Sequence, residues 1–261
     1  MLKANDILLY FVYKYKSNLD LVMNALREKE EVDANEVLNV VKNTKSKFIT
    51  ILDNEYPEVL KKIDRPPVLL FYEGDISLLK YKSEHKLSII GSRNYSEYGK
   101  EATKKVVSEL DKDYLIISGL ARGVDAISHE EALNHGLKTI CVLADGLYKV
   151  YPSENLNLYK KIISNGGLAI TEYHDFVEPQ KEFFLARNRI VAALCNFLLV
   201  SEAYSRSGTQ RTVSCALNYG KDVGCIPYEA NKGSFCNELI KEGAFLIETA
   251  EDVNRALEKI K

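Results

Sequence analysis

Short, continuously apolar segments recur along the chain from residue 87 onward, and stretches with helical spacing of apolar positions separate most of them. Segments of this kind are typical of strands buried on both faces of a sheet. One intervening stretch, residues 101–110, places Val106, Val107 and Leu110 on one helical face. Because right-handed crossovers connect parallel strands, the alternation predicts an extended Rossmann-like, doubly wound α/β fold with a mainly parallel sheet. The predicted strands are Leu87–Ile90, Tyr114–Ile117, Lys138–Leu143, Leu168–Thr171, Phe197–Val200, Val223–Ile226 and Phe245–Ile247.

Before residue 45 the pattern changes to that of short helices. It predicts a small N-terminal helical domain over residues 1–44, followed by the Rossmann-like domain over residues 45–261. Residues 48–52 predict a strand, and Arg65-Pro66-Pro67 forces extended chain before a further apolar segment. The N-terminal positions with helical spacing are Ile7, Leu8, Phe11, Val12, Tyr15, Val37, Leu38, Val40 and Val41.

Composition excludes several classes of protein. The chain has 261 residues, of which 46% are hydrophobic and 28% charged, so disorder and fibrous architectures are excluded. Five widely spaced cysteines form no CxxC pair, which argues against a zinc site or a disulfide framework. No apolar run approaches the roughly 20 residues that span a bilayer, and the N-terminus shows no signal pattern. We expect a cytoplasmic protein without membrane contact.

The charge is unevenly distributed. The net charge of −2 excludes binding of nucleic acid by bulk charge, so such binding requires a local patch. Residues 181–221 contain six basic and two acidic residues, a net charge of +4. The basic residues are Lys181, Arg187, Arg189, Arg206, Arg211 and Lys221, and the acids are Glu182 and Glu202. This segment coincides with the crevice in which doubly wound sheets bind ligands, at the carboxyl ends of the strands.

The first turn at that edge is Gly91-Ser92-Arg93, which leaves a strand and enters a helix. Free N–H groups at a helix start suit phosphate, and Arg93 adds a fork of donors. The turn lacks the GxGxxG fingerprint, which disfavours a dinucleotide cofactor. Asn94 and Ser96 could simply cap the helix, but capping does not explain the arginine.

The second turn contains Gly119 and Gly123, four residues apart. Glycines at this spacing let the backbone approach a ligand or turn sharply. Arg122 either contacts a ligand or clamps the loop by hydrogen bonds to its carbonyl groups. Asp125 is predicted to cap the following helix rather than to act in catalysis.

The third turn, residues 145–152, places Tyr148 and Tyr151 beside Lys149. Rings next to a cation suit single-stranded nucleic acid. The alternative is a packed loop whose rings cover the sheet edge, and the octapeptide alone favours that interpretation.

Two further turns carry arginines or hydroxyl groups. Arg187-Asn188-Arg189 is predicted at a helix start, and its arginines point in different directions, so one could reach a ligand while the other braces the fold. Ser207-Gly208-Thr209, in the hydroxyl-rich turn 205–212, resembles a phosphate cradle at a helix N-terminus, with plain capping as the alternative.

Taken in order, these turns resemble the DNA-processing A family (DprA, also called Smf). The resemblance extends from about Phe48 to Val253, and the ordered set is more specific than any single motif. The matching segments are Tyr56-Pro57, 64–70, Gly74-Asp75, Ile90-Gly91-Ser92-Arg93, 118–125, Tyr151-Pro152, Arg187-Asn188-Arg189-Ile190, Ser207-Gly208-Thr209 and 236–244.

The resemblance implies a homodimeric protein that binds single-stranded DNA. Members of this family act in natural transformation and recombination by loading the RecA recombinase onto DNA and helping to displace single-strand-binding protein. No enzymatic activity and no cofactor are implied. We expect the dimer surface around Cys236 to Phe245. Because many members carry a C-terminal winged helix and this chain ends at Lys261, we expect that domain to be absent.

The resemblance also implies individual roles. Arg93 would contact DNA phosphate, and Gly119, Arg122 and Gly123 would shape the pocket wall. The rest of the phosphate track would comprise Gly91, Ser92, Lys149, Arg187, Asn188, Arg189, Ser207, Gly208 and Thr209. Bases would stack on Tyr148, Tyr151 and Phe183.

Three departures from the family pattern stand out. Ala144-Asp145-Gly146 occupies a turn that usually has a second glycine, and an acid there would repel phosphate near Lys149 unless it turns away. Residues 210–213 replace a more apolar continuation, and Pro227-Tyr228 stands where Pro-Gly is common.

A competing hypothesis comes from the nucleotide phosphoribohydrolases of the lysine-decarboxylase-like group. There a carboxylate assists cleavage of an N-glycosidic bond, and Glu202, at a strand's carboxyl end, would be the candidate catalyst. The PGGxGT turn of that group is not found, since Ser207-Gly208-Thr209 is only a fragment of it. A mononucleotide sensor without turnover is a third possibility.

Overall fold

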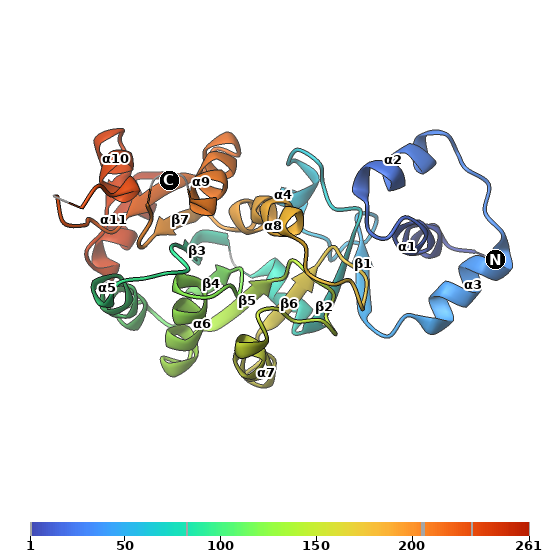
Figure 1. Cartoon of the computed structure of the whole chain (residues 1–261), viewed down its shortest axis with the longest axis horizontal. Helices are drawn as coiled ribbons and strands as arrows, with labels where there is room; N and C mark the ends of the chain where they lie inside the picture. Colours follow the sequence, from blue (N-terminus) through green and yellow to red (C-terminus); the bar gives the residue numbers. More distant parts are fainter. Residues whose placement is uncertain (1, 82, 205–206, 231, 261) are drawn as a thin grey trace.

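A nine-stranded sheet runs through the computed structural model, which describes residues 2–81, 83–204, 207–230 and 232–260 (Figure 1). The strand order is β1-β2-β6-β5-β4-β3-β7-β8-β9. From β6 to β9 all neighbours are parallel, whereas β1 and β2 join one edge antiparallel. The strands are β1 (Lys47–Thr50), β2 (Leu69–Gly74), β3 (Lys86–Ile90), β4 (Leu115–Ser118), β5 (Lys138–Val142), β6 (Leu168–Thr171), β7 (Phe197–Val200), β8 (Asp222–Cys225) and β9 (Phe245–Leu246).

The sheet is doubly wound, which confirms the predicted fold class. The chain proceeds from β3 outward through β4 and β5 to β6, then crosses back and continues from β7 to β9 on the other side of β3. The strand order therefore reverses between β3 and β7. Doubly wound sheets bind ligands at such a switch point, outside the carboxyl ends of the strands.

Helices cover both faces of the sheet. Helices α8 and α9 lie on one face, and α5, α6 and α7 on the other (Figure 1). They are α4 (Glu58–Lys61), α5 (Glu97–Ser108), α6 (Val124–Asn134), α7 (Leu156–Ser164), α8 (Lys181–Leu194), α9 (Gly208–Asn218), α10 (Phe235–Lys241) and α11 (Ala250–Ile260). Short 3-10 turns are η1 (Ile76–Lys80), η2 (Ser83–His85) and η3 (Ser153–Asn155).

Strand β4 shows why the central strands are continuously apolar. Successive side chains in a strand point to opposite faces. Leu115 and Ile117 pack in the cluster beneath α8, whereas Ile116 packs in the cluster with α5 and α6. Each face is buried by helices, so polar residues would lack solvent on either side.

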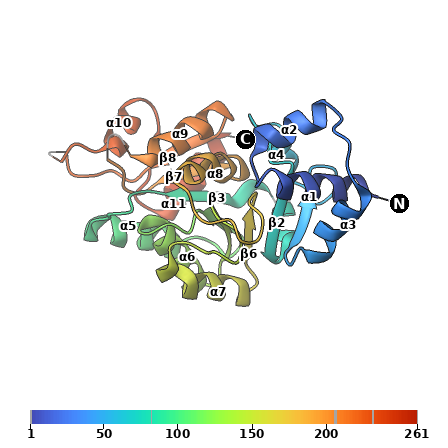
Figure 2. The ribbon, with the colours of Figure 1, turned by 45° about the vertical axis from the view of Figure 1, so that its right-hand side comes forward.

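Three helices precede the sheet and pack beside β1 and β2 in both views (Figures 1 and 2). They are α1 (Ala4–Lys14), α2 (Leu19–Arg27) and α3 (Ala34–Asn43), and all three lie within residues 1–44, where the apolar spacing predicts short helices. Leu9 and Phe11 share a hydrophobic cluster with Leu69 and Phe71 of β2. The division of the chain near residue 44 into two domains stays a prediction.

The segment after β6 joins these helices to the sheet through Asp175. The buried Asp175 carboxylate accepts hydrogen bonds from the Tyr13 hydroxyl at 3.1 Å and from the Lys45 backbone N–H at 2.9 Å. The Tyr13 ring stacks on His174, with centroids 4.7 Å apart. Within the described ranges, none of the helices combines the length and apolar character needed to cross a membrane.

Candidate functional site

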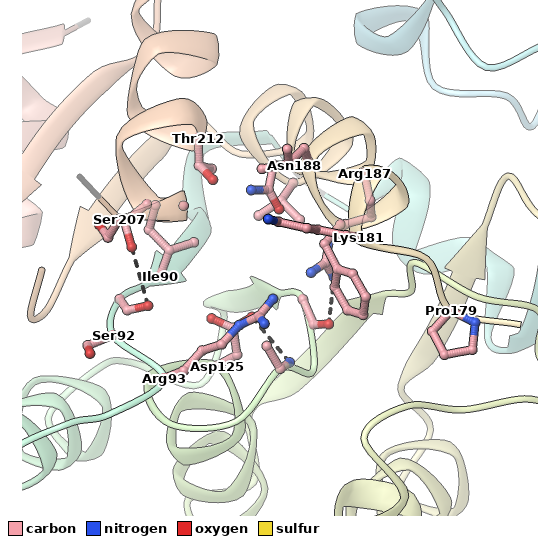
Figure 3. A pocket seen from close by; sticks show the side chains of 18 of the residues that line it. Ile90, Ser92, Arg93, Asp125, Pro179, Lys181, Arg187, Asn188, Ser207 and Thr212 are labelled. Carbon is pink, nitrogen blue, oxygen red and sulfur yellow. Dashed lines mark hydrogen bonds between the residues drawn. The ribbon is translucent and has the colours of Figure 1, made fainter.

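A cleft of about 720 Å³ opens at the carboxyl ends of β3 and β4, between the turn after β7 and helix α8 (Figure 3). This is the switch point of the sheet. Arg93 from the β3 turn and Lys181 and Arg187 from α8 reach into it, while Ser207 marks the start of α9 (Figure 3). The volume lies in the range of pockets that bind small molecules or portions of larger ligands.

The structure brings together ten of the sixteen side chains and glycines predicted for the site. Those that line the cleft are Gly91, Ser92, Arg93, Gly119, Tyr151, Arg187, Asn188, Ser207, Gly208 and Thr209. Those outside the lining are Arg122, Gly123, Tyr148, Lys149, Phe183 and Arg189. The role of each of these residues in DNA binding stays a prediction.

Arg187 is a buried clamp. Its side chain is 3% exposed, and Nη1 donates to the carbonyl of Gly119 at 2.5 Å and to the carbonyl of Val142. These carbonyls belong to the turn after β4 and to the last residue of β5, so the guanidinium holds α8 against both strand ends. A Cβ atom on Gly119 would lie 2.3 Å from the guanidinium nitrogens, which explains the glycine there.

The clamping role considered for Arg122 thus falls to Arg187. Arg122 itself is exposed and forms an ion pair with Glu154 at 2.6 Å. Its neighbour Gly123 has a φ of +79°, a left-handed conformation that side chains rarely adopt. A Cβ on Gly123 would lie 2.2 Å from the carbonyl oxygen of Ser92, so this glycine lets the first two turns meet.

Two buried acids lie near the Arg187 charge. Burial raises the pKa of Asp125, and the Arg187 charge opposes that rise. Burial likewise raises the pKa of Asp145 to about 7, again opposed by Arg187. Asp145 is fully buried and accepts a hydrogen bond from the Tyr151 N–H at 3.2 Å, so this departure from the family pattern does not place an exposed acid beside the cleft.

The charge of the cleft lining is mostly positive. Among the described lining residues Asp125 is the single acid, whereas Arg93, Lys181 and Arg187 are cations.

Arg189 braces a different part of the fold. It forms a two-pronged ion pair with Glu172, both bonds 2.6 Å long, and donates to the Arg65 carbonyl at 3.0 Å. The prediction that Arg187 and Arg189 lie at a helix start is wrong. Helix α8 begins at Lys181, so both lie well inside it, and residues two apart on a helix point to different sides.

Arg93 and Phe184 form the wall opposite the β7 turn. The Arg93 guanidinium carbon lies 5.1 Å from the Phe184 ring centroid, and the Tyr151 ring meets the same ring edge-on at 5.9 Å. Phe183, the predicted stacking ring, is stacked instead on buried Tyr173 at 4.2 Å. Phe184 and Lys181 are among the lining residues that were not predicted for the site. Two adjacent phenylalanines in the sequence indicate an aromatic side chain at this position. Only the rotational position of each residue on helix α8 decides which of the two rings faces the cleft.

The start of α9 supplies polar groups. The Thr209 hydroxyl donates to the Gly91 carbonyl at 3.3 Å, which joins the β7 turn to the β3 turn. The buried Ser207 hydroxyl has no hydrogen-bond partner among the described residues. The first N–H groups of a helix lack intrahelical acceptors, which suits an anion. Arg206, counted in the basic segment, lies outside the described residues.

Glu202, the candidate catalyst of the competing hypothesis, is engaged away from the cleft. It is buried and accepts from the Ser96 N–H at 3.0 Å, the Ser96 hydroxyl at 2.9 Å and the Tyr204 hydroxyl at 2.6 Å. It supports the N-terminus of α5 and does not line the cleft.

Lys149 and Tyr148 lie beyond the lining. The Lys149 ammonium pairs with Glu178 at 2.6 Å, and the exposed Tyr148 ring stacks on Phe176. The loop interpretation and the nucleic-acid interpretation of this turn are therefore both compatible with its placement.

Comparison with known proteins gives consistent matches. The family model described as DNA recombination-mediator protein A matches residues 47–258. DNA processing protein DprA of Streptococcus pneumoniae is 42% identical over 206 residues, covering 78% of this chain and 72% of that protein. Protein Smf of Borreliella burgdorferi is 32% identical over 260 residues, covering 97% and 77%.

Two solved structures of the same kind superpose on the chain. The X-ray structure of DNA processing protein A from Streptococcus pneumoniae has a TM-score of 0.83 at 33% identity and covers 97% of this chain and 98% of that one. A structure of DNA processing protein A from Helicobacter pylori, described for its single-stranded DNA binding mode, has a TM-score of 0.72 at 32% identity, covering 82% and 97%.

Replacing Arg187 by Met tests the clamp. The change leaves two buried carbonyls without their donor and buried Asp145 without its nearby cation, so we expect a loss of about 3–5 kcal/mol in the free energy of unfolding. Urea denaturation measures it. Arg122→Met is the matched control, because Arg122 is exposed, and its urea midpoint should stay close to wild type. Equal midpoints for the two variants would contradict the clamp.

Replacing Asp145 by Asn tests the buried acid. With a pKa of about 7 when folded and about 3.9 when unfolded, Asp145 keeps a proton in the folded protein that the unfolded chain releases. Stability therefore falls as pH rises from about 4 to about 7, by up to about 1.4 kcal/mol per pH unit. Asn keeps the acceptor for the Tyr151 N–H but removes this slope. Urea midpoints of wild type and Asp145→Asn, measured between about pH 4 and about pH 7, test this difference in slope. Parallel pH profiles for the two proteins would refute the assigned role of Asp145.

Proposed function

The chain belongs to the DNA recombination-mediator protein A family, whose members include proteins named DprA and Smf, and from this premise we propose that it binds single-stranded DNA as a recombination mediator. The observation that carries the proposal is the cleft at the switch point, which is lined by Arg93, Lys181 and the start of α9, with Asp125 the single acid among its described lining residues. Positive charge focused in a cleft raises the local concentration of an anionic ligand even though the whole chain carries −2.

In the proposed complex Arg93 and the N-terminus of α9 hold phosphates from opposite walls. Gly91, Ser92 and Gly208 let the strand come close to the backbone, and Asn188 offers an amide to it. Tyr151 is 45% exposed and lies edge-on to Phe184, so this pair offers a surface on which a base can stack. These side chains would contact the phosphates and the faces of the bases rather than the base edges. Binding would therefore depend little on the DNA sequence.

The recombination role adds partners. We propose that the protein loads a RecA-type recombinase onto DNA during natural transformation and recombination, helps to displace single-strand-binding protein, and works in the cytoplasm, where that DNA lies. A homodimer would present two binding tracks and gain avidity. The proposed dimer surface includes α10 and β9, because β9 is an edge strand with Leu246 48% exposed, and an open edge can pair with a second copy.

Arg93→Ala tests the proposed function. Loss of one charged phosphate contact should weaken single-stranded DNA binding about tenfold and reduce the log–log salt slope by about 0.7. Fluorescence anisotropy with a labelled oligonucleotide and a duplex competitor measures both. Arg255→Ala, which removes an exposed arginine of α11 outside the cleft, is the matched control. Full affinity in Arg93→Ala, or no binding by wild type at low salt, would refute the proposal.

We propose binding without turnover, supported by the engagement of Glu202 with Ser96 and Tyr204. Incubation with nucleoside monophosphates should release no ribose 5-phosphate above a protein-free blank. Release that disappears in Glu202→Gln would instead establish the phosphoribohydrolase activity.

A further inference from the structure

Two exposed aromatic rings lie together outside the cleft. Tyr148, in the loop after β5, is 52% exposed, and Phe176, in the loop after β6, is 48% exposed. Their centroids are 5.3 Å apart and their planes are inclined by 30°. Large apolar rings exposed as a pair leave a face on which a further planar group can stack.

A lysine from the start of the sheet region completes this group. Lys45, between α3 and β1, places its ammonium 5.1 Å from the Phe176 centroid and 5.8 Å from that of Tyr148. In the described part of the chain no carboxylate oxygen lies within 4.0 Å of this ammonium. Lys149 is a second nearby cation, held by Glu178. We call Lys45, Tyr148 and Phe176 the ring platform.

The platform is built on a fixed support. The Tyr148 N–H donates to the Asp175 carbonyl at 3.1 Å, and the Lys45 N–H donates to the Asp175 carboxylate at 2.9 Å. The Gly146 N–H donates to the Val177 carbonyl at 2.9 Å. Three segments far apart in the sequence therefore meet at one buried aspartate. A site held in this way loses little entropy when it binds.

Both loops lead directly from the platform into the cleft. Tyr151 and Pro179 line the cleft, and each lies three residues after its platform ring, Tyr148 or Phe176. Three residues span at most about 10 Å. A flexible chain bound in the cleft would thus pass over the platform when it leaves past Tyr151.

We propose that the ring platform is a second base-stacking subsite, which binds single-stranded DNA where it leaves the cleft. Its ligand is an unpaired base, stacked on the exposed rings, with the adjoining phosphate near Lys45. The inference rests on the proposed function, because it extends the same DNA track. Rings combined with an unpaired cation, continuous with a positive cleft, favour a nucleic acid strand over a protein partner.

Oligonucleotide length separates the platform from the cleft. Anisotropy would be measured with oligothymidylates of about 6 and about 20 nucleotides, because single-stranded sites of this kind cover about 4–16 nucleotides. Phe176→Leu removes the ring but keeps an apolar side chain, and should weaken binding of the longer strand about tenfold while leaving the shorter strand unchanged. Phe176→Tyr keeps a ring and should bind both strands like wild type.

The role of the Lys45 charge is tested with the same two oligonucleotides. Lys45→Ala should lower the salt slope of the longer strand by about 0.7 and leave that of the shorter strand unchanged. Lys160→Ala is its matched control, because Lys160 is exposed on α7 and outside the cleft lining.

Each result has a distinct meaning. Unchanged binding of the short strand shows that a variant is folded and that the cleft is intact. Equal affinity of Phe176→Leu and wild type for the longer strand would overturn the platform while the cleft stands. Failure of wild type to bind either strand would overturn the proposed function itself.

Discussion

The buried guanidinium of Arg187 is the interaction on which the arrangement of the cleft depends. A charge taken out of water is tolerated only where hydrogen bonds and opposite charge replace the lost hydration. Here the carbonyls of Gly119 and Val142 accept hydrogen bonds from it. The carboxyl groups of Asp125 and Asp145 lie close enough to interact with its charge. Meeting these demands requires a glycine at 119 and α8 fixed over the ends of β4 and β5.

With α8 fixed in this way, the cations near the cleft fall into two groups, one buried and one exposed. Arg187 and Arg189 are buried and occupied with carbonyls and Glu172, and they give the site its shape. Arg93 and Lys181 are exposed and line the cleft. This division explains how a chain with a slight negative charge presents a positive cleft. The basic segment of the sequence contains both kinds, and counting charges does not separate them.

Asp175 has a similar organising role at the other end of the site. It joins Tyr13 and Lys45 to the loop after β6, whose backbone in turn supports the loop after β5. The N-terminal helices are thereby connected to the turn that carries Tyr148, Lys149 and Tyr151. The helices carry no cleft residue of their own, yet through this aspartate they help to determine where those side chains lie.

The sequence by itself determined the fold class, the family and the edge of the sheet at which the cleft lies. Continuous apolar strands separated by helical stretches can bury both faces only in a covered parallel sheet, so this much follows from local pattern. The same holds for the glycine and hydroxyl content of the β3 and β7 turns, which is contained in a few adjacent residues. Side-chain roles were decided by the tertiary structure. Arg187 rather than Arg122 became the clamp, Phe184 rather than Phe183 faces the cleft, and Glu202 supports α5. Each of these depends on a partner distant in the chain, as Lys45 depends on Asp175, 130 residues away. Which partners meet is set by packing and helix phase, and neither is readable from adjacent residues.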